Sequence, residues 1–186
     1  MKDYTQDITT YLEKEKSVID LIDKQAINTV MNVLEKAREE GRQVFVMGNG
    51  GSAATASHYV CDFNKGISYG KYQRYRFICL NDNVPTLMAY ANDISYNDIF
   101  IEQLKNFYRS GDVVLGISGS GNSENVVRAM LWAKDNNATT IAFTGYDGGK
   151  LHQIAEYKVN IPVHDMQITE DLHMMLDHCM MKILCQ

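Results

Sequence analysis

The sequence contains few prolines and no long apolar run. Only 2 of its 186 residues are proline, and no stretch reaches the roughly 18 consecutive apolar residues that a membrane-spanning helix requires. The opening stretch, MKDYTQDITTYLEKEK, mixes charges of both signs and lacks the apolar core of a signal peptide. We therefore expect a cytoplasmic protein with no membrane partner.

Positive charge is also scarce. The 18 lysines and arginines are outnumbered by 23 aspartates and glutamates, which gives a formal net charge of -5, and no basic run occurs. Nucleic acids and anionic membrane surfaces attract proteins through clustered basic residues. We therefore expect no nucleic acid partner.

The sequence offers no disulfide framework. Its 4 cysteines, Cys61, Cys79, Cys179 and Cys185, form no Cys-x-x-Cys pair and lie inside apolar stretches, so we expect small, buried, reduced thiols. A chain of this length buries roughly 70% of the surface that its unfolded form exposes, so it needs neither a disulfide nor a structural metal in order to fold. The composition, 45% apolar and 22% charged, is typical of a single globular domain.

The first forty residues are predicted to be helical. No proline or glycine interrupts residues 4–40, and apolar residues recur at helical spacing, which indicates two amphipathic helices with a break near Lys24. A helix that projects before the core in this way often packs against a second subunit. We therefore assign residues 1–40 to an N-terminal helical oligomerisation region and residues 41–186 to one compact domain.

After Gly41 the pattern changes to short apolar runs that end in glycine-rich turns and precede helical stretches. This alternation is typical of parallel βαβ units whose strands are buried on both faces. The predicted strands are residues 44–47, 76–80, 113–117, 140–143 and 157–161, and the predicted helices begin near Ser52, Pro85, Asn122 and Lys150, with a last helix over about 168–184. We predict a three-layer α/β fold with a doubly wound, flavodoxin-like, five-stranded parallel sheet and a ligand at the carboxyl ends of the strands.

The first glycine-rich loop, GNGGS at residues 48–52, follows the first predicted strand. Its glycines let backbone N–H groups approach an anion, and Ser52 can donate a hydroxyl and cap the following helix. The same loop matches the G-x-G-x-x-G/A dinucleotide fingerprint, which ends here at Ala53, and Asp82 would then be the ribose ligand. A dinucleotide-dependent oxidoreductase is therefore one alternative.

The second loop, SGSGNS at residues 118–123, follows the third predicted strand and concentrates serine hydroxyls beside glycines. Two such loops at strand ends of one sheet fit a compact phosphomonoester, whose oxygens need many short donors, better than an extended pyrophosphate. The alternative is that both loops are tight turns with serine caps.

Three pairs of polar residues have helical spacing. They are His58 and Asp62 on the helix after the first loop, and Glu170 with His178 and His173 with Asp177 on the last helix. A histidine and a carboxylate from each helix would supply the nitrogen and oxygen ligands of a zinc-type site, or an acid and a base around a carbonyl. The alternative is an ordinary surface hydrogen bond within each helix.

The motifs, taken in order, resemble those of a known family. They are GNGGSAA at residues 48–54 followed by His58, AND at 91–93 with NDIF at 97–100, ISGSGNS at 117–123, TGYDGGK at 144–150, and the terminal helix with Glu170 and His178. They are similar to the sugar isomerase (SIS) domain, and specifically to its phosphoheptose isomerase branch. The similarity covers nearly the whole chain and implies that residues 41–186 form the SIS domain.

The resemblance implies a cytoplasmic enzyme that interconverts sedoheptulose 7-phosphate and a heptose 7-phosphate aldose through an enediol. It also implies a homotetramer with active sites between subunits, and a divalent metal, commonly zinc. Asp62 and His178 are the implied acid and base, and the implied metal ligands are His58, Asp62, Glu170 and His178. The predicted substrate-binding residues are Asn49, Gly50, Gly51, Ser52, Asn92, Asp93, Ser118, Gly119, Ser120, Ser123 and Glu170.

The chain departs from the family pattern at four positions in or near the predicted site. Asp62 is one methylene shorter than the family's glutamate, and Glu170 is negatively charged where the family has a neutral glutamine. Gly119 replaces a threonine, and Gln167 replaces an aspartate.

The alternative from another class is a non-catalytic SIS module that binds a sugar phosphate or a protein, as in the branch associated with the DnaA replication initiator. That branch lacks the full acid–base set.

Overall fold

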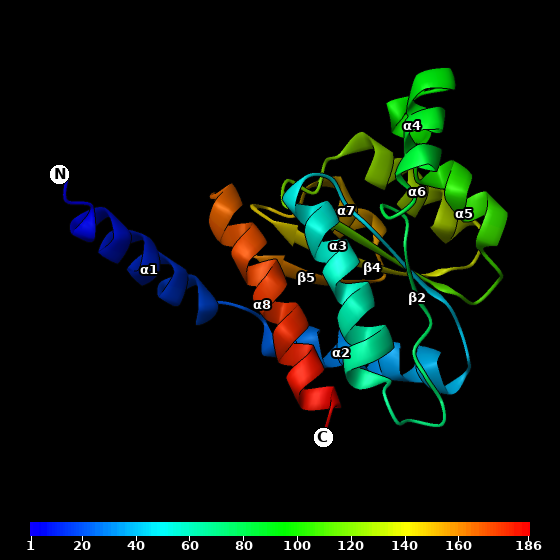
Figure 1. Cartoon of the computed structure of the whole chain (residues 1–186), viewed down its shortest axis with the longest axis horizontal. Helices are drawn as coiled ribbons and strands as arrows, with labels where there is room; N and C mark the ends of the chain where they lie inside the picture. Colours follow the sequence, from blue (N-terminus) through cyan, green and yellow to red (C-terminus); the bar gives the residue numbers. More distant parts are fainter.

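The computed structural model describes residues 1–186 and contains one five-stranded parallel sheet (Figure 1). Its strands are β1 (Val44–Met47), β2 (Phe77–Cys79), β3 (Val113–Ser118), β4 (Thr139–Gly145) and β5 (Tyr157–Ile161), in the order β2-β1-β3-β4-β5. Every neighbouring pair is parallel. The structure confirms the predicted fold class and all five strands. β2 is shorter than predicted at both ends, and β4 is longer at both ends.

The helices connect the strands and flank the sheet. They are α1 (Thr5–Ile19), α2 (Lys24–Glu39), α3 (Gly51–Cys61), α4 (Val84–Asp93), α5 (Ile101–Phe107), α6 (Glu124–Asp135), α7 (Gly149–Ile154) and α8 (Met166–Leu184), with a π-helix η1 (Asp62–Ile67) after α3 and a 3₁₀ turn η2 (Tyr96–Asp98) after α4. α5, η1 and η2 are additions to the prediction, because each is shorter than two helical turns and shows no periodicity in the sequence. None of the helices combines the length and the apolar character needed to span a bilayer.

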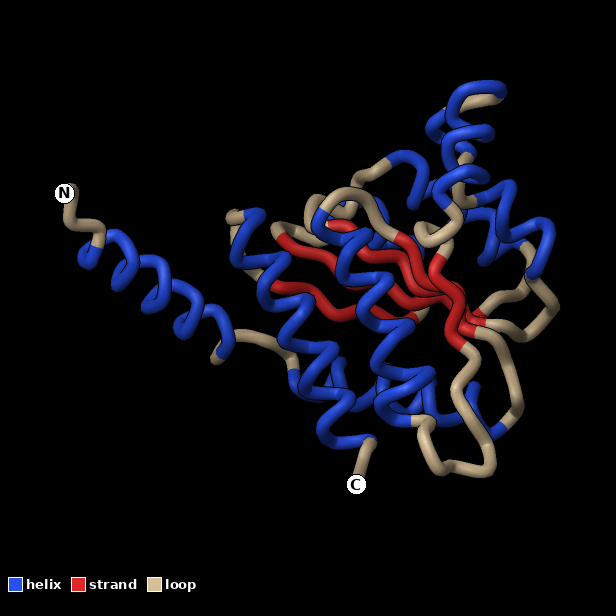
Figure 2. The backbone as a smooth tube through the Cα atoms, viewed as in Figure 1, coloured by secondary structure: helices blue, strands red, loops and turns tan.

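The sheet is the middle one of three layers (Figure 2). Alternate residues of β1 point to opposite faces, as the pleat of a strand requires. Val44 and Val46 belong to the core cluster that α2, α3 and α8 complete, and Phe45 and Met47 belong to the one that α5, α6 and α7 complete. Both faces of the sheet are therefore covered, which explains why β1 and β3 are buried along their whole length and read as mostly apolar runs.

The predicted N-terminal region divides into two parts. α2 belongs to the core, since its Val30 and Leu34 are fully buried. α1 projects from the body of the molecule (Figure 1), and Val18 is its only buried residue. An ion pair of 2.7 Å between Lys14 Nζ and Asp165 Oδ2 links α1 to the start of α8. The assembly role predicted for this region stays a prediction.

The cysteines form no disulfide, but the expectation that all are buried is wrong. Cys79 in β2 is buried, whereas Cys61, Cys179 and Cys185 are exposed. The three exposed thiols lie on or directly after α3 and α8, and these two helices cover one face of the sheet and turn their outer faces to solvent. The apolar neighbours in sequence belong to the inner faces of these helices.

Candidate functional site

The site lies where the order of the strands reverses. β1 and β3 are neighbours in the sheet, but β1 leads on to β2 at one edge and β3 leads on to β4 toward the other. Open parallel sheets bind ligands in the crevice outside the carboxyl ends of two such strands. Here the loops of residues 48–52 and 118–123 follow β1 and β3 and line a cavity of about 280 Å³. We call it the serine cavity.

Three serine hydroxyls from the second loop gather at this cavity. Ser118 Oγ lies 3.1 Å from Ser123 Oγ and 3.5 Å from Ser120 Oγ. All three residues line the serine cavity at the N-terminus of α6, and no lysine or arginine lines it. Hydroxyl donors and the free N–H groups of a helix N-terminus stabilise a bound anion. The cavity therefore offers an anion many dipoles and no fixed cation.

The first loop is fixed by its glycine and by a pair of amides. Gly50 has φ +56° and ψ -123°, a conformation that glycine adopts readily, and this turns the chain from β1 into α3. The side chains of Asn49 and the buried Asn125 exchange two hydrogen bonds of 2.8 and 2.9 Å. The Tyr96 hydroxyl donates a third, of 2.9 Å, to Asn49 Oδ1. Because Asn125 lies in the first turn of α6, directly after the second loop, these bonds tie the first loop to the start of α6.

The first turns of α8 form the remaining wall of the serine cavity. Met166 covers Gly119, because a Cβ added at Gly119 would lie 2.5 Å from Met166 Sδ. The Glu170 carboxylate lies against Gly51, where any Cβ would collide with it. This places a negative charge at the N-terminus of α3, where the helix dipole favours it. The glycine at position 119 is therefore matched to a bulky methionine across the cavity.

A second polar group lies between α3 and α8. His58 on α3, Asp62 at the start of η1, and Asp177 and His178 on α8 each offer one ligand atom, and these atoms lie within 4.8 Å of one another. His58 Nε2 is 3.0 Å from His178 Nε2, 3.5 Å from Asp62 Oδ2 and 3.9 Å from Asp177 Oδ2. We call these four residues the His–Asp cluster.

The carboxylates of the His–Asp cluster are buried, and its imidazoles are accessible. Asp177 has an exposed fraction of 0%, and neither of its carboxylate oxygens has a hydrogen-bond partner. Asp62 Oδ2 also lacks one. Burial, and then the nearby Asp62, raise the pKa of Asp177 to about 8. A buried carboxylate without a donor costs several kcal/mol unless it binds a proton or a cation, so these orphaned oxygens fit a divalent metal.

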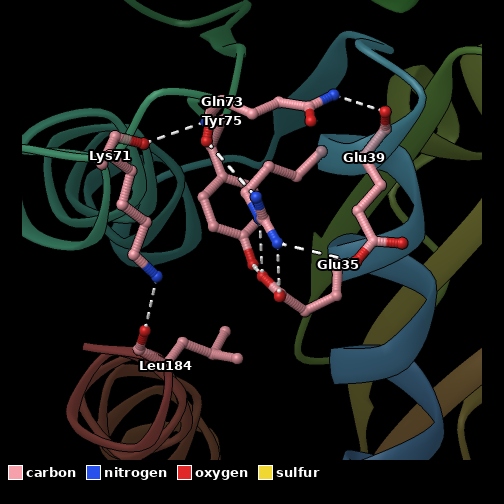
Figure 3. Close-up of polar contacts among 8 residues, drawn as sticks. Glu35, Glu39, Lys71, Gln73, Tyr75 and Leu184 are labelled. Atoms are coloured by element: carbon pink, nitrogen blue, oxygen red, sulfur yellow. Dashed lines mark hydrogen bonds and ion pairs between the residues drawn. The ribbon is translucent and has the colours of Figure 1, made fainter. Parts of the chain in front are cut away.

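A separate set of polar contacts joins α2, α8 and the loop that follows η1 (Figure 3). The Glu35 carboxylate pairs with Arg38 at 2.9 Å and accepts a hydrogen bond from the Tyr75 hydroxyl. In the same loop, Lys71 Nζ donates to the carbonyl of Leu184 at 2.9 Å. Arg38 is the main cause that lowers the pKa of Glu35. The network holds the end of α8 against the segment that continues from η1.

The structure brings His58, Asp62 and His178 together, as the sequence predicts. Glu170, the predicted fourth ligand, lies outside the His–Asp cluster and lines the serine cavity instead. Eight residues separate it from His178, which is about 12 Å along a helix. Within this chain Glu170 therefore lines the serine cavity, and His178 belongs to the His–Asp cluster.

The other predicted substrate-binding residues also fall into two groups, one at the serine cavity and one outside it. The residues of the two loops line or border the serine cavity, but Asn92 and Asp93 are exposed on α4 and lie outside it. Asn92 Nδ2 donates to Asp93 Oδ1 at 2.7 Å. Asp82, the ribose ligand of the dinucleotide alternative, lines a different cavity beside β2.

Asp177 is the cluster residue that sequence reasoning missed. Its spacing from His173 suggested that these two residues share a site, but His173 is fully buried and its Nε2 donates to the Thr144 carbonyl at 3.1 Å. Burial lowers the pKa of His173 to about 4, so it is a neutral core residue. The sequence signal that could have identified Asp177 is its place directly before His178, on the apolar side of the last helix.

Comparisons with known proteins agree with this geometry. The family model described as SIS domain matches residues 3–145. The phosphoheptose isomerase of Aquifex aeolicus is 38% identical over 166 residues, covering 87% of this chain and 82% of the relative. That of Thermodesulfovibrio yellowstonii is 37% identical over 164 residues, covering 86% of this chain and 77% of the relative.

Solved structures are similar over the whole chain. Phosphoheptose isomerase GmhA from Neisseria gonorrhoeae has a TM-score of 0.90 at 24% sequence identity, covering 98% of both chains. A phosphoheptose isomerase from Francisella tularensis has a TM-score of 0.88 at 25% identity, also covering 98% of both chains. The fold of this chain is therefore shared along its full length with these proteins.

Proposed function

The chain belongs to the SIS domain family, in its phosphoheptose isomerase branch, and from that premise we propose that it is an aldose–ketose isomerase of a phosphorylated sugar. The proposed reaction converts sedoheptulose 7-phosphate to a heptose 7-phosphate aldose. The proposed location is the cytoplasm, and the proposed assembly is a homotetramer.

One arrangement supports this proposal above the others. The serine cavity and the His–Asp cluster lie along the same pair of helices, with Ser52 and His58 both on α3 and Glu170 and His178 both on α8. Six residues, or about 9 Å of helix, separate Ser52 from His58. An extended sugar phosphate can therefore place its phosphate at one end of the crevice and its carbonyl at the other.

The loops supply binding and orientation in this proposal. The hydroxyls of Ser118, Ser120 and Ser123, with Ser52 and the N–H groups at the start of α6, hold the phosphate. Asn49, Gly50, Gly51, Gly119 and Glu170 border the sugar chain, and Asn92 and Asp93 are proposed contacts from the exposed helix α4. Anchoring the phosphate fixes the position of the reacting carbons before any proton moves.

The His–Asp cluster supplies the acid and the base. Asp62 and His178 are the proposed acid–base pair: one removes the proton from the carbon beside the carbonyl, and the other donates a proton to the carbonyl oxygen, which yields the enediol. A side chain that holds the metal in a given state does not carry the proton in that state. Return of a proton to the neighbouring carbon, with loss of the proton from the other oxygen, completes the isomerisation. His58, Asp62 and His178 would hold a divalent metal, with zinc as the proposed identity. When bound, this metal would polarise the carbonyl.

The proposal is tested by assaying C5 to C7 ketose and aldose phosphates, with and without a chelator. We expect turnover of the seven-carbon ketose phosphate, and we expect the His178→Gln protein to lose it while keeping the wild-type circular dichroism spectrum. A folded wild-type protein that binds sugar phosphates without converting any of them would support the non-catalytic SIS module. Saturable binding of a nicotinamide dinucleotide would support the oxidoreductase alternative.

A further inference from the structure

We infer that Asp177 is a direct ligand of the metal site, so that this chain builds the site from two histidines and two aspartates, His58, Asp62, Asp177 and His178. The inference rests on the metal part of the proposed function. Of the two carboxylate ligands of the site, the first is Asp62. The inference identifies the second as Asp177 and not as Glu170, which lines the serine cavity.

The first support is the isolation of the Asp177 carboxylate. Its side chain is fully buried on the inner side of α8, and neither oxygen accepts a hydrogen bond from any donor. Its titratable neighbours are Asp62, which repels it, and His58, whose Nε2 is 3.9 Å from Asp177 Oδ2. Buried carboxylates are normally paired, hydrogen-bonded or bound to a metal. A divalent cation between the four side chains would satisfy the oxygens of both aspartates at once.

The second support is the spacing of the ligand atoms. The distances of 3.0, 3.5 and 3.9 Å from His58 Nε2 to its three neighbours bracket the value of about 3.3 Å between ligand atoms in a tetrahedral site with bonds of about 2.0 Å. Two imidazoles and two carboxylates are a ligand set that suits zinc, and the two negative charges neutralise the charge of a divalent ion.

The position of Glu170 supports the same assignment. Its carboxylate lies against Gly51 at the N-terminus of α3, on the serine cavity. About 12 Å of helix separates it from His178, whereas Asp177 directly precedes His178. From α8, Asp177 faces His58 of α3, with 3.9 Å between Asp177 Oδ2 and His58 Nε2.

The test compares two variants that each remove one carboxylate, Asp177→Asn and Glu170→Gln, in metal-free full-length protein. Zn²⁺ affinity is measured by competition with a chromophoric chelator, and the visible absorption of bound Co²⁺ reports the coordination. We expect Asp177→Asn to weaken Zn²⁺ binding by at least about 10- to 100-fold and to change the Co²⁺ spectrum. We expect Glu170→Gln to stay within about threefold of wild type with an unchanged Co²⁺ spectrum.

A thermal melt separates loss of a ligand from loss of the fold. Metal-free Asp177→Asn should melt at or above the temperature of the metal-free wild type, because the change removes an unpartnered buried carboxyl. Asp177→Leu provides the apolar counterpart. Both variants should lose most of the stabilisation that added Zn²⁺ gives the wild type.

Three results would overturn the inference. They are wild-type Zn²⁺ affinity in both folded Asp177 variants, loss of affinity in Glu170→Gln alone, and absence of Zn²⁺ binding by the wild type. The isomerase assay is independent of all three. If Asp177→Asn weakens Zn²⁺ binding while the wild type binds Zn²⁺ but never converts a sugar phosphate, the metal site stands and the proposed reaction is refuted.

Discussion

Ser120 presents its hydroxyl to the serine cavity from the centre of the second loop. Replacement by alanine removes one donor to the phosphate, and such hydrogen bonds to a charged group contribute about 1.5 kcal/mol. We expect Ser120→Ala to raise both the KM for the sugar phosphate and the inhibition constant of inorganic phosphate about tenfold. Steady-state kinetics checks this, with Ser110→Ala, an exposed serine just before β3, as the matched control. Unchanged constants in Ser120→Ala would remove the phosphate from this loop.

His173 is expected to make the protein sensitive to acid. Its pKa falls from 6.5 to about 4 in the folded protein because of burial. The unfolded chain therefore binds a proton as the pH drops below 6.5, while the folded protein does not until about pH 4. The contribution of His173 to the free energy of unfolding should fall across this window, by on the order of 3 kcal/mol in total. Urea denaturation at pH 7, 6 and 5 measures the slope.

Comparison with His173→Gln isolates this contribution. Asp177 acts in the opposite direction over the same window, because a carboxyl whose pKa is raised from 3.8 to about 8 in the folded protein stabilises it most at low pH and loses that effect progressively as the pH rises from about 4 to about 8. This term is common to both proteins and cancels in their difference. Equal pH slopes for the wild type and His173→Gln would show that His173 is not the buried neutral group described above.

The site residues differ in how far the sequence could predict them. His58 and Asp62 are separated by four residues on one helix, so their common face follows from helical spacing alone. The roles of His173 and Asp177 could not be separated in this way, because they have the same spacing. The rotation of α8 about its axis is set by the burial of Leu172, Leu176 and Met180 against the sheet, and only this packing directs Asp177 toward His58.

At the scale of elements, the pair of amides from Asn49 and Asn125 connects the first loop of the site to the start of α6. Asn125→Leu removes both hydrogen bonds and leaves the Asn49 amide with only the Tyr96 hydroxyl. We expect this change to lower the free energy of unfolding by about 1–3 kcal/mol and to raise KM about tenfold or more. Chemical denaturation and steady-state kinetics check the two effects. Asn106→Ala, an exposed asparagine on α5, is the control, and equal kinetics in both variants would refute the coupling.

The network around Glu35 is expected to act on stability and not on chemistry. Glu35→Gln removes the ion pair with Arg38 and weakens the contact with Tyr75, at a cost of about 1–2 kcal/mol, since the group is partly exposed. The melting temperature should fall while kcat stays at the wild-type value. Glu13→Gln, an exposed residue of α1, should change neither. A fall in kcat without loss of stability would contradict this division.

Helices and strands could be predicted where the apolar pattern in the sequence is long enough to show a period. The central strands β1, β3 and β4 read as buried, mostly apolar runs, whereas the edge strand β5, YKVNI, is only partly buried. β2, at the other edge, is shorter than its apolar run and pairs with β1 over three residues. The π-helix η1 could not be predicted, because a change from α to π hydrogen bonding leaves no mark on apolar periodicity. Its position matters because Asp62 is its first residue, and π-turns are frequent at functional sites.

At the scale of the whole molecule, α1 exposes an apolar face that nothing in this chain covers. Ile8 is 57% and Leu12 48% exposed. If α1 packs on another copy, lysines at both positions should shift the proposed tetramer to smaller species in sedimentation velocity experiments, because charged groups resist burial in an interface. Thr10→Lys, at an exposed polar position of α1, is the control. A stable, active wild-type monomer would refute the assembly.

The sequence and the structure of one chain give the least information about how copies of the chain assemble. The apolar residues of α1 predict that something covers them, but their partner is determined by a surface of another molecule. α4, which carries Asn92 and Asp93, likewise has no buried residue. The serine cavity and the His–Asp cluster are built within one chain, so the central claim can be tested without knowledge of the assembly.

Proton exchange during turnover tests that claim most directly. Sedoheptulose 7-phosphate is incubated with the enzyme in D₂O and followed by proton NMR. An enediol mechanism predicts that anomeric signals of an aldose appear, and that the protons on the ketose carbon next to the carbonyl are replaced by deuterium in the presence of wild-type protein and not of His178→Gln. A wild-type protein that binds this ketose phosphate and leaves both its carbon-bound protons and its spectrum unchanged would contradict the account.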